Sequence, residues 1–215
     1  RTAPYHIFAG SQDQGFQRST VDNGGIRDFV QVISGDYGHL CSGDQGQSIW
    51  ANYPGFSIYY PNAATSNQAF TLDFPTSGHL WLAPIIADYT DPNVAYLGGG
   101  GVGNGNHIVR LQANQSSISY EEYPQAFSGT VSAMAISTVN YERWYAMTST
   151  GNFYRSNDSG ASWQLTFGGG PDSHYFYGST ILPSKNNEDV VYIGGSGYSN
   201  SPVFYSTNGG NSFQP

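Results

Sequence analysis

The residues with the clearest potential for chemistry lie in the segment Ser34-Gly35-Asp36-Tyr37-Gly38-His39-Leu40. Asp36 and His39 are three residues apart, a spacing that in a tight turn can bring a carboxylate and an imidazole together as acid and base. The alternative is that Asp36 only accepts hydrogen bonds from backbone N–H groups of its own turn. Because an apolar stretch follows, we expect the segment to be a loop that can present side chains to a ligand.

Asp13 is a further candidate for a catalytic carboxylate, and Asp44 and Asp88 are weaker ones. Inverting glycoside hydrolysis needs two carboxyl groups about 6.5–9.5 Å apart, which sequence spacing does not reveal. Exposed aromatic rings can stack on sugars, although rings at alternating strand positions more often belong to the core. The candidate binding residues are Tyr37, Trp50 and Trp81.

Several other kinds of site find little support in the sequence. The five histidines are scattered, and the Asp-containing loop Gly43-Asp44-Gln45-Gly46 offers few carboxylates for calcium, so no metal and no cofactor is predicted. The single cysteine, Cys41, excludes an intrachain disulfide and is expected to be a buried, inert thiol. The glycine-rich run 98–106 is followed by no Lys-Ser/Thr pair, so we interpret it as a hairpin loop, not a phosphate site.

A structural motif stands out at Ser156-Asn157-Asp158-Ser159-Gly160-Ala161-Ser162-Trp163. Asp158 can accept backbone N–H groups across a turn, and Gly160 can take the positive φ that closes it. Trp163 then opens the next strand with a large apolar ring. The run 206–213 repeats the pattern with Asn and Phe in place of Asp and Trp. The residues predicted to hold these two turns are Ser156, Asp158, Gly160, Trp163, Ser206, Asn208, Gly210 and Phe213.

These turns resemble the Asp-box, or BNR repeat, of β-propellers of the sortilin-like, sialidase-like and xyloglucanase-like superfamily. The segment 10–15 (Gly-Ser-Gln-Asp-Gln-Gly) resembles the Gly-x-Gln-Asp-x-Gly turn of the same proteins, and 34–40 resembles their Gly-Gly-Asp-Gly-Gly element. The resemblance implies four-stranded blades with Asp-boxes at the blade periphery, away from the central cleft. It also implies that Asp158 folds its turn and takes no part in catalysis.

Composition agrees with an all-β protein. Among 215 residues, 15% are aromatic and only 10% charged, and 28 Gly and 11 Pro supply turns. The net charge of −8, with Lys185 as the single lysine, offers no basic surface for nucleic acid. No apolar run approaches the length of a membrane span, so no membrane partner is predicted. Because a basic surface is also missing, no nucleic-acid partner is predicted.

The chain also repeats with the period of a propeller blade. Tyrosines at 96, 145 and 192 follow similar apolar runs at intervals of 49 and 47 residues, the length of four short strands with their turns. The sequence therefore predicts four to five blades in an incomplete ring. The expected boundaries are a partial blade at 1–34, blades at about 35–76, 77–125 and 126–172, and a partial blade at 173–215.

These observations predict a piece of a larger secreted or cell-surface protein, with the remaining blades supplied by the same longer chain or by a partner chain. The expected role is binding of a glycan or protein ligand, or a structural one. The alternatives are part of a glycoside hydrolase and a passenger domain of a large adhesin. Sialidase activity is not expected, because no Arg-Ile-Pro entry motif is present and Arg18 and Arg155 precede turns as blade-edge residues.

Overall fold

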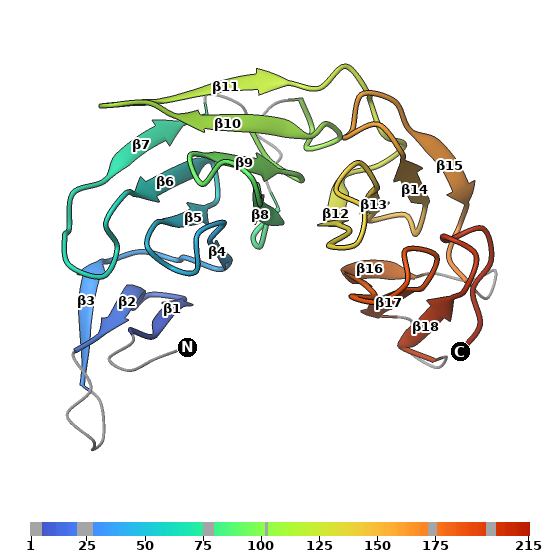
Figure 1. Cartoon of the computed structure of the whole chain (residues 1–215), viewed down its shortest axis with the longest axis horizontal. Helices are drawn as coiled ribbons and strands as arrows, with labels where there is room; N and C mark the ends of the chain where they lie inside the picture. Colours follow the sequence, from blue (N-terminus) through green and yellow to red (C-terminus); the bar gives the residue numbers. More distant parts are fainter. Residues whose placement is uncertain (1–5, 21–27, 75–79, 102, 172–175, 197–200) are drawn as a thin grey trace. The chain divides into compact units, whose positions relative to one another are not determined.

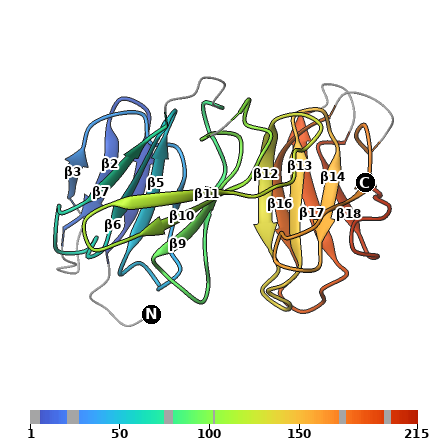
Figure 2. The same cartoon turned by 90° about the horizontal axis from the view of Figure 1, so that it is seen from above.

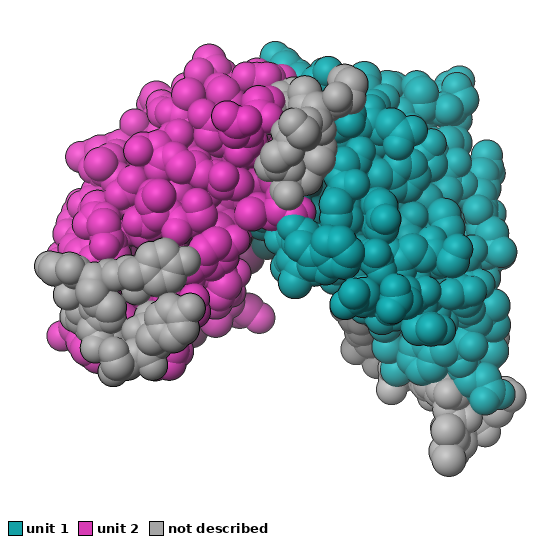
Figure 3. All heavy atoms as spheres, turned by 180° about the vertical axis from the view of Figure 1, so that it is seen from behind, with its two compact units in different colours: residues 1–75, 81–97, 110–121 teal, residues 76–80, 98–109, 122–215 magenta. Residues whose placement is uncertain are grey.

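The structure is a computed structural model that describes residues 6–20, 28–74, 80–101, 103–171, 176–196 and 201–215. It contains two compact units, coloured separately in Figure 3. Unit 1 comprises residues 1–75, 81–97 and 110–121, and unit 2 comprises 76–80, 98–109 and 122–215. The two units are described separately below.

Unit 1 holds two antiparallel sheets and most of a third, with the strands labelled in Figure 1. The first sheet has the order β1-β2-β3 and the second β4-β5-β6-β7. The third has the order β11-β10-β9-β8. Their strands are β1 (Phe8–Ser11), β2 (Gly15–Ser19), β3 (Phe29–Ile33), β4 (Leu40–Cys41), β5 (Ile49–Tyr53), β6 (Phe56–Tyr60), β7 (Phe70–Asp73), β8 (Ile85–Ala87), β9 (Val94–Leu97), β10 (Val109–Ala113) and β11 (Ile118–Glu122).

Unit 2 is built around two antiparallel sheets, with the orders β12-β13-β14-β15 and β16-β17-β18, whose strands run alongside one another in Figure 2. The strands are β12 (Val131–Ile136), β13 (Trp144–Thr148), β14 (Phe153–Ser156), β15 (Gln164–Phe167), β16 (Tyr177–Pro183), β17 (Val191–Ser196) and β18 (Val203–Ser206). The predicted all-β fold of four-stranded antiparallel sheets is confirmed, and the described residues include no helix long and apolar enough to cross a membrane. The five sheets span residues 8–33, 40–73, 85–122, 131–167 and 177–206.

Alternating apolar residues explain why these segments are strands. In β10 the side chains of Val109, Leu111 and Ala113 are buried and the two between them are partly exposed, the period of a strand with one covered face. In unit 2 the facing sides of the two sheets bury one cluster: Ala133, Ala135, Tyr145, Met147, Phe153, Phe176, Ile181, Val191, Ile193 and Phe204. Burying a side chain such as Ile193 contributes about 1.5–3 kcal/mol, so this pair of packed sheets has a substantial core.

Three turns share one hydrogen-bonding pattern, and two of them are the predicted motifs. In the turn after β14, the Ser156 hydroxyl donates to the Asp158 carboxylate (2.7 Å) and accepts the Gly160 N–H (2.9 Å). The Asp158 carboxylate in turn accepts the Ser162 N–H (2.8 Å). The turn after β18 repeats these bonds with an amide oxygen at Asn208.

The third such turn joins β4 to β5 and was not predicted. Here Ser42 donates to Asp44 (2.8 Å) and accepts the Gly46 N–H (2.8 Å), and Asp44 accepts the Ser48 N–H (2.9 Å). Gln45 and Gly46 have φ of 63° and 91°, the same left-handed pair found at the end of the other two turns. A Ser-x-Asp-x-Gly-x-Ser pattern is visible at 42–48, so the sequence did carry the signal; its position between a first and a second strand obscured it.

Candidate functional site

The predicted loop 34–39 lies beside the turn between β1 and β2 in unit 1. Gln14 and Gly35 form an isolated parallel bridge, and the Asp36 carboxylate accepts the backbone N–H of Asp13 at 2.7 Å. Asp13 has a positive φ of 63°, which is uncommon for a residue with a side chain. Asp36 therefore links two segments of the chain. The N–H group from which its carboxylate accepts a hydrogen bond belongs to Asp13, and not to a residue of the turn that contains Asp36.

The structure does not pair Asp36 with His39 as acid and base. The backbone of Leu82, in the loop that leads to β8, is instead the polar neighbour that acts on the His39 ring. Surrounding protein atoms lower the pKa of His39 by desolvation, and the Leu82 backbone partly opposes that shift. His39 is therefore neutral near pH 7 and keeps its place through a backbone contact.

A pocket of about 370 Å³ opens next to this loop. Tyr37 lies almost fully buried in its wall, while Tyr53, at the end of β5, is 38% exposed. The two ring centroids are 6.1 Å apart. Burial, with a smaller contribution from Tyr53, raises the pKa of Tyr37 to about 12, so its phenol stays neutral. Phe56 and the exposed Asp73 also line the pocket and can contact a ligand.

The two candidate tryptophans have opposite environments. Trp50 is fully buried, its indole N–H donates to the Pro92 carbonyl at 3.0 Å, and its ring lies 4.6 Å from that of Tyr59. This core position removes Trp50 from the candidate ligand-binding residues. Trp81 is 53% exposed, and its neighbour Leu82 packs so closely on Gly38 that a Cβ there would lie 2.1 Å from a Leu82 methyl carbon.

Unit 1 thus brings four of the six candidate site residues, Asp13, Asp36, Tyr37 and His39, into one chain of contacts, and Trp81 precedes Leu82, which packs on Gly38. We call this surface the loop face of unit 1. It consists of Asp13, Asp36, Tyr37, His39, Tyr53, Asp73, Trp81 and Leu82. Tyr53, Asp73 and Leu82 carried no signal in the sequence, since their role depends on which loops the sheets bring together.

Comparison with solved structures gives strong matches of fold. The chain matches the GH74 enzyme of Niastella koreensis (TM-score 0.58, 16% identity) and the GH74 xyloglucanase of Xanthomonas campestris (TM-score 0.56, 14% identity). It matches Chaetomium thermophilum Sqt1, solved bound to the N-terminus of ribosomal protein L10, with a TM-score of 0.64 and 13% identity. The fold is that of a β-propeller. No protein-family model and no curated protein sequence matches the chain.

The extent of these matches differs from one propeller to another. They cover 81%, 78% and 95% of this chain, respectively. The chain spans 28% of the length of each GH74 protein and 56% of Sqt1. At such identities the likeness shows the propeller fold alone, and the chemistry must be argued from the residues of this chain.

The eight residues that define the loop face include aromatic rings and carboxylates and no lysine or arginine. Tyr53 and Trp81 present apolar ring faces with polar tips, while Asp73 and Asp13 present charge. Such a surface can stack on the C–H face of a sugar and accept hydrogen bonds from its hydroxyl groups.

The Asp-box-type turns offer no comparable site. The carboxylates of Asp44 and Asp158 and the amide of Asn208 are all engaged within their own turns. The described residues contain no group of three or more His, Cys, Asp or Glu able to hold a metal ion. Cys41 is half-buried and not fully buried as predicted. Desolvation nevertheless raises the pKa of its thiol to about 12, which keeps the thiol protonated.

Proposed function

We propose that this chain is an Asp-box-type propeller module of an extracellular protein that binds neutral glycans through the loop face of unit 1. The observation that carries the proposal is the exposed ring of Tyr53 at a pocket near three aspartates, with the exposed Trp81 next in sequence to Leu82, which packs on Gly38 of the same loop. Three turns with the same hydrogen-bonding pattern support the Asp-box assignment.

The charge on the loop face favours neutral over acidic sugars. Asp13, Asp36 and Asp73 would repel a uronate or a sulfated sugar, and none of the eight residues that define the loop face is Lys or Arg. A neutral sugar avoids that repulsion, stacks on an aromatic ring and donates its hydroxyls to the carboxylates. The pocket of about 370 Å³ is large enough to receive part of one sugar unit beside Tyr37.

Affinity electrophoresis in gels containing a neutral polysaccharide tests the proposal. Xyloglucan and a mixed-linkage β-glucan serve as neutral probes, and polygalacturonate serves as the acidic one. We expect retardation by a neutral probe only. Tyr53→Ala and Trp81→Ala should each weaken it about 10-fold, since a stacking residue at the centre of a site contributes more than about 1 kcal/mol.

Tyr192→Ala is the matched control, because Tyr192 is 44% exposed but belongs to β17 in unit 2. If Tyr192→Ala reduced retardation as much as Tyr53→Ala, binding would be unspecific stacking and the proposal would fail. Retardation by polygalacturonate alone would overturn it as well.

A second function, glycoside hydrolysis, is favoured by one observation: two of the solved propellers that match this fold are GH74 enzymes, one of them a xyloglucanase. Asp13 and Asp36 are then the candidate carboxylates, already joined through the 2.7 Å bond from the Asp13 N–H. Release of reducing ends from xyloglucan, lost in Asp13→Asn, would favour this function. Retardation without release would favour the binding module.

A further inference from the structure

The pocket next to the loop 34–39 is lined by aromatic rings and one carboxylate that share a face of the sheet β4–β7. The pairing registers place Tyr53 of β5 opposite Phe56 of β6, and Phe56 opposite Asp73 of β7. Side chains at directly opposite positions lie on the same face of a sheet, with Cβ atoms about 4.5–5.5 Å apart. Two rings and a carboxylate therefore form one row across the sheet, and all three line the pocket of about 370 Å³.

Tyr37, from the neighbouring loop, adds a third ring to the pocket wall. Its ring centroid lies 6.1 Å from that of Tyr53, and the two ring planes are inclined by 48°. Gly35 lies against the edges of both rings, because a Cβ there would be 3.1 Å from Cε2 of Tyr37 and 3.8 Å from Cδ2 of Tyr53. Since Gly35 carries no side chain, nothing from this position fills the space where the two rings meet.

The charges around this pocket are negative. Asp73 is exposed, and none of the eight residues that line the pocket is Lys, Arg or His. Asp36 and Asp13, joined by their 2.7 Å hydrogen bond, lie in the adjoining loops, and the chain as a whole has a net charge of −8. The face of an aromatic ring is the negative part of its quadrupole. Rings and carboxylates therefore attract the same kind of ligand, which is a cation.

We propose that this pocket binds a small quaternary ammonium cation of the choline type. The ammonium group lies within about 6 Å of the Tyr53 ring, with Phe56 and Tyr37 beside it and Asp73 as its counter-ion. A quaternary ammonium group has no N–H to satisfy, so a wall of rings can receive it without leaving a hydrogen bond unmade. This inference goes beyond the proposed glycan binding and does not depend on it, although both use Tyr53.

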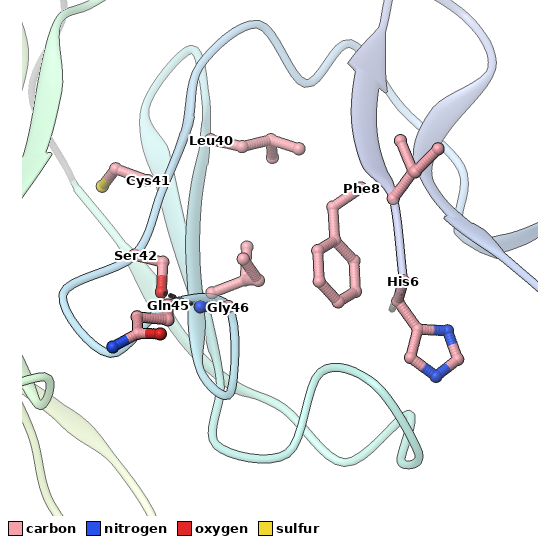
Figure 4. Close-up of a pocket in the computed structure, with 9 residues that line it drawn as sticks. His6, Phe8, Leu40, Cys41, Ser42, Gln45 and Gly46 are labelled. Carbon is pink, nitrogen blue, oxygen red and sulfur yellow. Dashed lines mark hydrogen bonds between the residues drawn. The ribbon is translucent and has the colours of Figure 1, made fainter. Parts of the chain in front are cut away.

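Another pocket of unit 1, of about 360 Å³, provides a comparison. Figure 4 shows the Phe8 and Leu40 side chains pointing toward one another across it, with the Cys41 sulfur pointing away. The ring of His6 also lines this pocket, and its nine lining residues include neither Asp nor Glu. A cation there would have no counter-ion, so we expect choline to select the pocket at Tyr53.

Titration of the chain with choline, followed by ligand-detected NMR, tests the proposal. Dimethylbutanol, in which a carbon atom replaces the charged nitrogen of choline, keeps the shape and removes the charge. Phosphocholine keeps the ammonium group and adds a phosphate that the aspartates repel. We expect choline to bind with a Kd of about 1 mM, and each of the other two probes to bind at least about 10-fold more weakly.

Matched variants locate the bound cation. Tyr53→Leu should weaken choline binding about 10-fold, whereas Tyr53→Phe, which keeps the ring, should bind as the wild type does. Asp73→Asn should weaken it about 3-fold, because the carboxylate is exposed and its charge is partly screened. Phe8→Leu, in the pocket of Figure 4, should leave the Kd unchanged. Circular dichroism checks that all four variants remain folded.

Several results would overturn the proposal. Equal binding of choline and dimethylbutanol would show that the charge of the ligand plays no part. Full binding by Tyr53→Leu, an equal loss in Phe8→Leu, or no binding of choline at about 10 mM would be equally decisive. Retardation by a neutral polysaccharide is measured separately, so its presence without choline binding would refute the cation site and leave the glycan proposal standing.

Discussion

The loop face of unit 1 and the Asp-box-type turns use the same residue types in opposite ways. In the turns, Asp44 and Asp158 accept two or more short hydrogen bonds from groups within four residues in sequence. On the loop face, Asp36 accepts a bond from a residue 23 positions away, and exposed aromatic rings lie nearby. A carboxylate engaged in its own turn folds the chain, whereas one set among exposed rings is available to a ligand.

Replacing the buried and the exposed tryptophan by alanine should give the largest difference in the free energy of unfolding. Trp50→Ala removes a fully buried ring and its hydrogen bond to Pro92, and should lower the free energy of unfolding by about 3–5 kcal/mol. Trp81→Ala, on the loop face, should change it by no more than about 0.5 kcal/mol. Urea denaturation of the two variants measures both values. Similar losses would contradict the placement of Trp81 on the surface.

Removing the carboxylate from two turns of the same geometry sharpens the comparison further. Asp44→Ala leaves the N–H of Ser48, a residue 1% exposed, without its acceptor, and should cost about 1–3 kcal/mol of unfolding free energy. Asp158→Ala frees the N–H of the exposed Ser162, which water can satisfy, so its cost should be smaller. The reverse order in urea denaturation would show that burial does not set the cost.

Low pH should destabilise the protein by protonating the carboxylate that holds the turn at Asp158. Hydrogen bonds from the Ser162 and Ser156 hydroxyls and the Ser162 N–H lower the pKa of Asp158. A carboxyl with a lowered folded-state pKa stabilises the fold above its unfolded pKa, about 3.9, and this contribution disappears as the pH falls further. The wild-type Tm should therefore drop more between pH 5 and 3 than that of Asp158→Asn. Parallel slopes in thermal scans would argue against it.

The smallest change in stability is expected between the turns at Asp158 and Asn208, whose hydrogen bonds are nearly the same. The Asn208 amide donates to the Ser212 hydroxyl (2.9 Å) where Asp158 accepts from the Ser162 hydroxyl (2.5 Å). Because a hydroxyl can reverse its role, Asn208→Asp should change the unfolding free energy by no more than about 0.5 kcal/mol. A Tm that shifts by more than about 2–4 °C, the equivalent of 1 kcal/mol, would contradict this.

Local patterns predicted much of the fold. The Ser-x-Asp-x-Gly turn at 156–163 and its variant at 206–213 form as expected, because their hydrogen bonds join residues within four positions. The 49- and 47-residue intervals between tyrosines agree with the equivalent places of Tyr145 and Tyr192 in their second strands.

The candidate site depended on contacts that the sequence does not encode locally. The Asp36 bond to Asp13 and the contact of His39 with Leu82 span 23 and 43 residues, so sequence spacing suggested the wrong partner for both. Trp50 and Trp81 look alike in sequence, and only strand packing shows that one is buried and one exposed.

The central claim is that the loop face of unit 1 contacts a glycan. Trp81 is 53% exposed, whereas Trp50 and Trp144 are no more than 3% exposed, so acrylamide quenches tryptophan fluorescence chiefly from exposed rings such as Trp81. The direct measurement is this quenching with and without a bound neutral oligosaccharide, in the wild type and in Trp81→Phe. We predict that the ligand protects the wild type and has no effect on Trp81→Phe. Binding of the ligand with unchanged quenching of the wild type would contradict the claim.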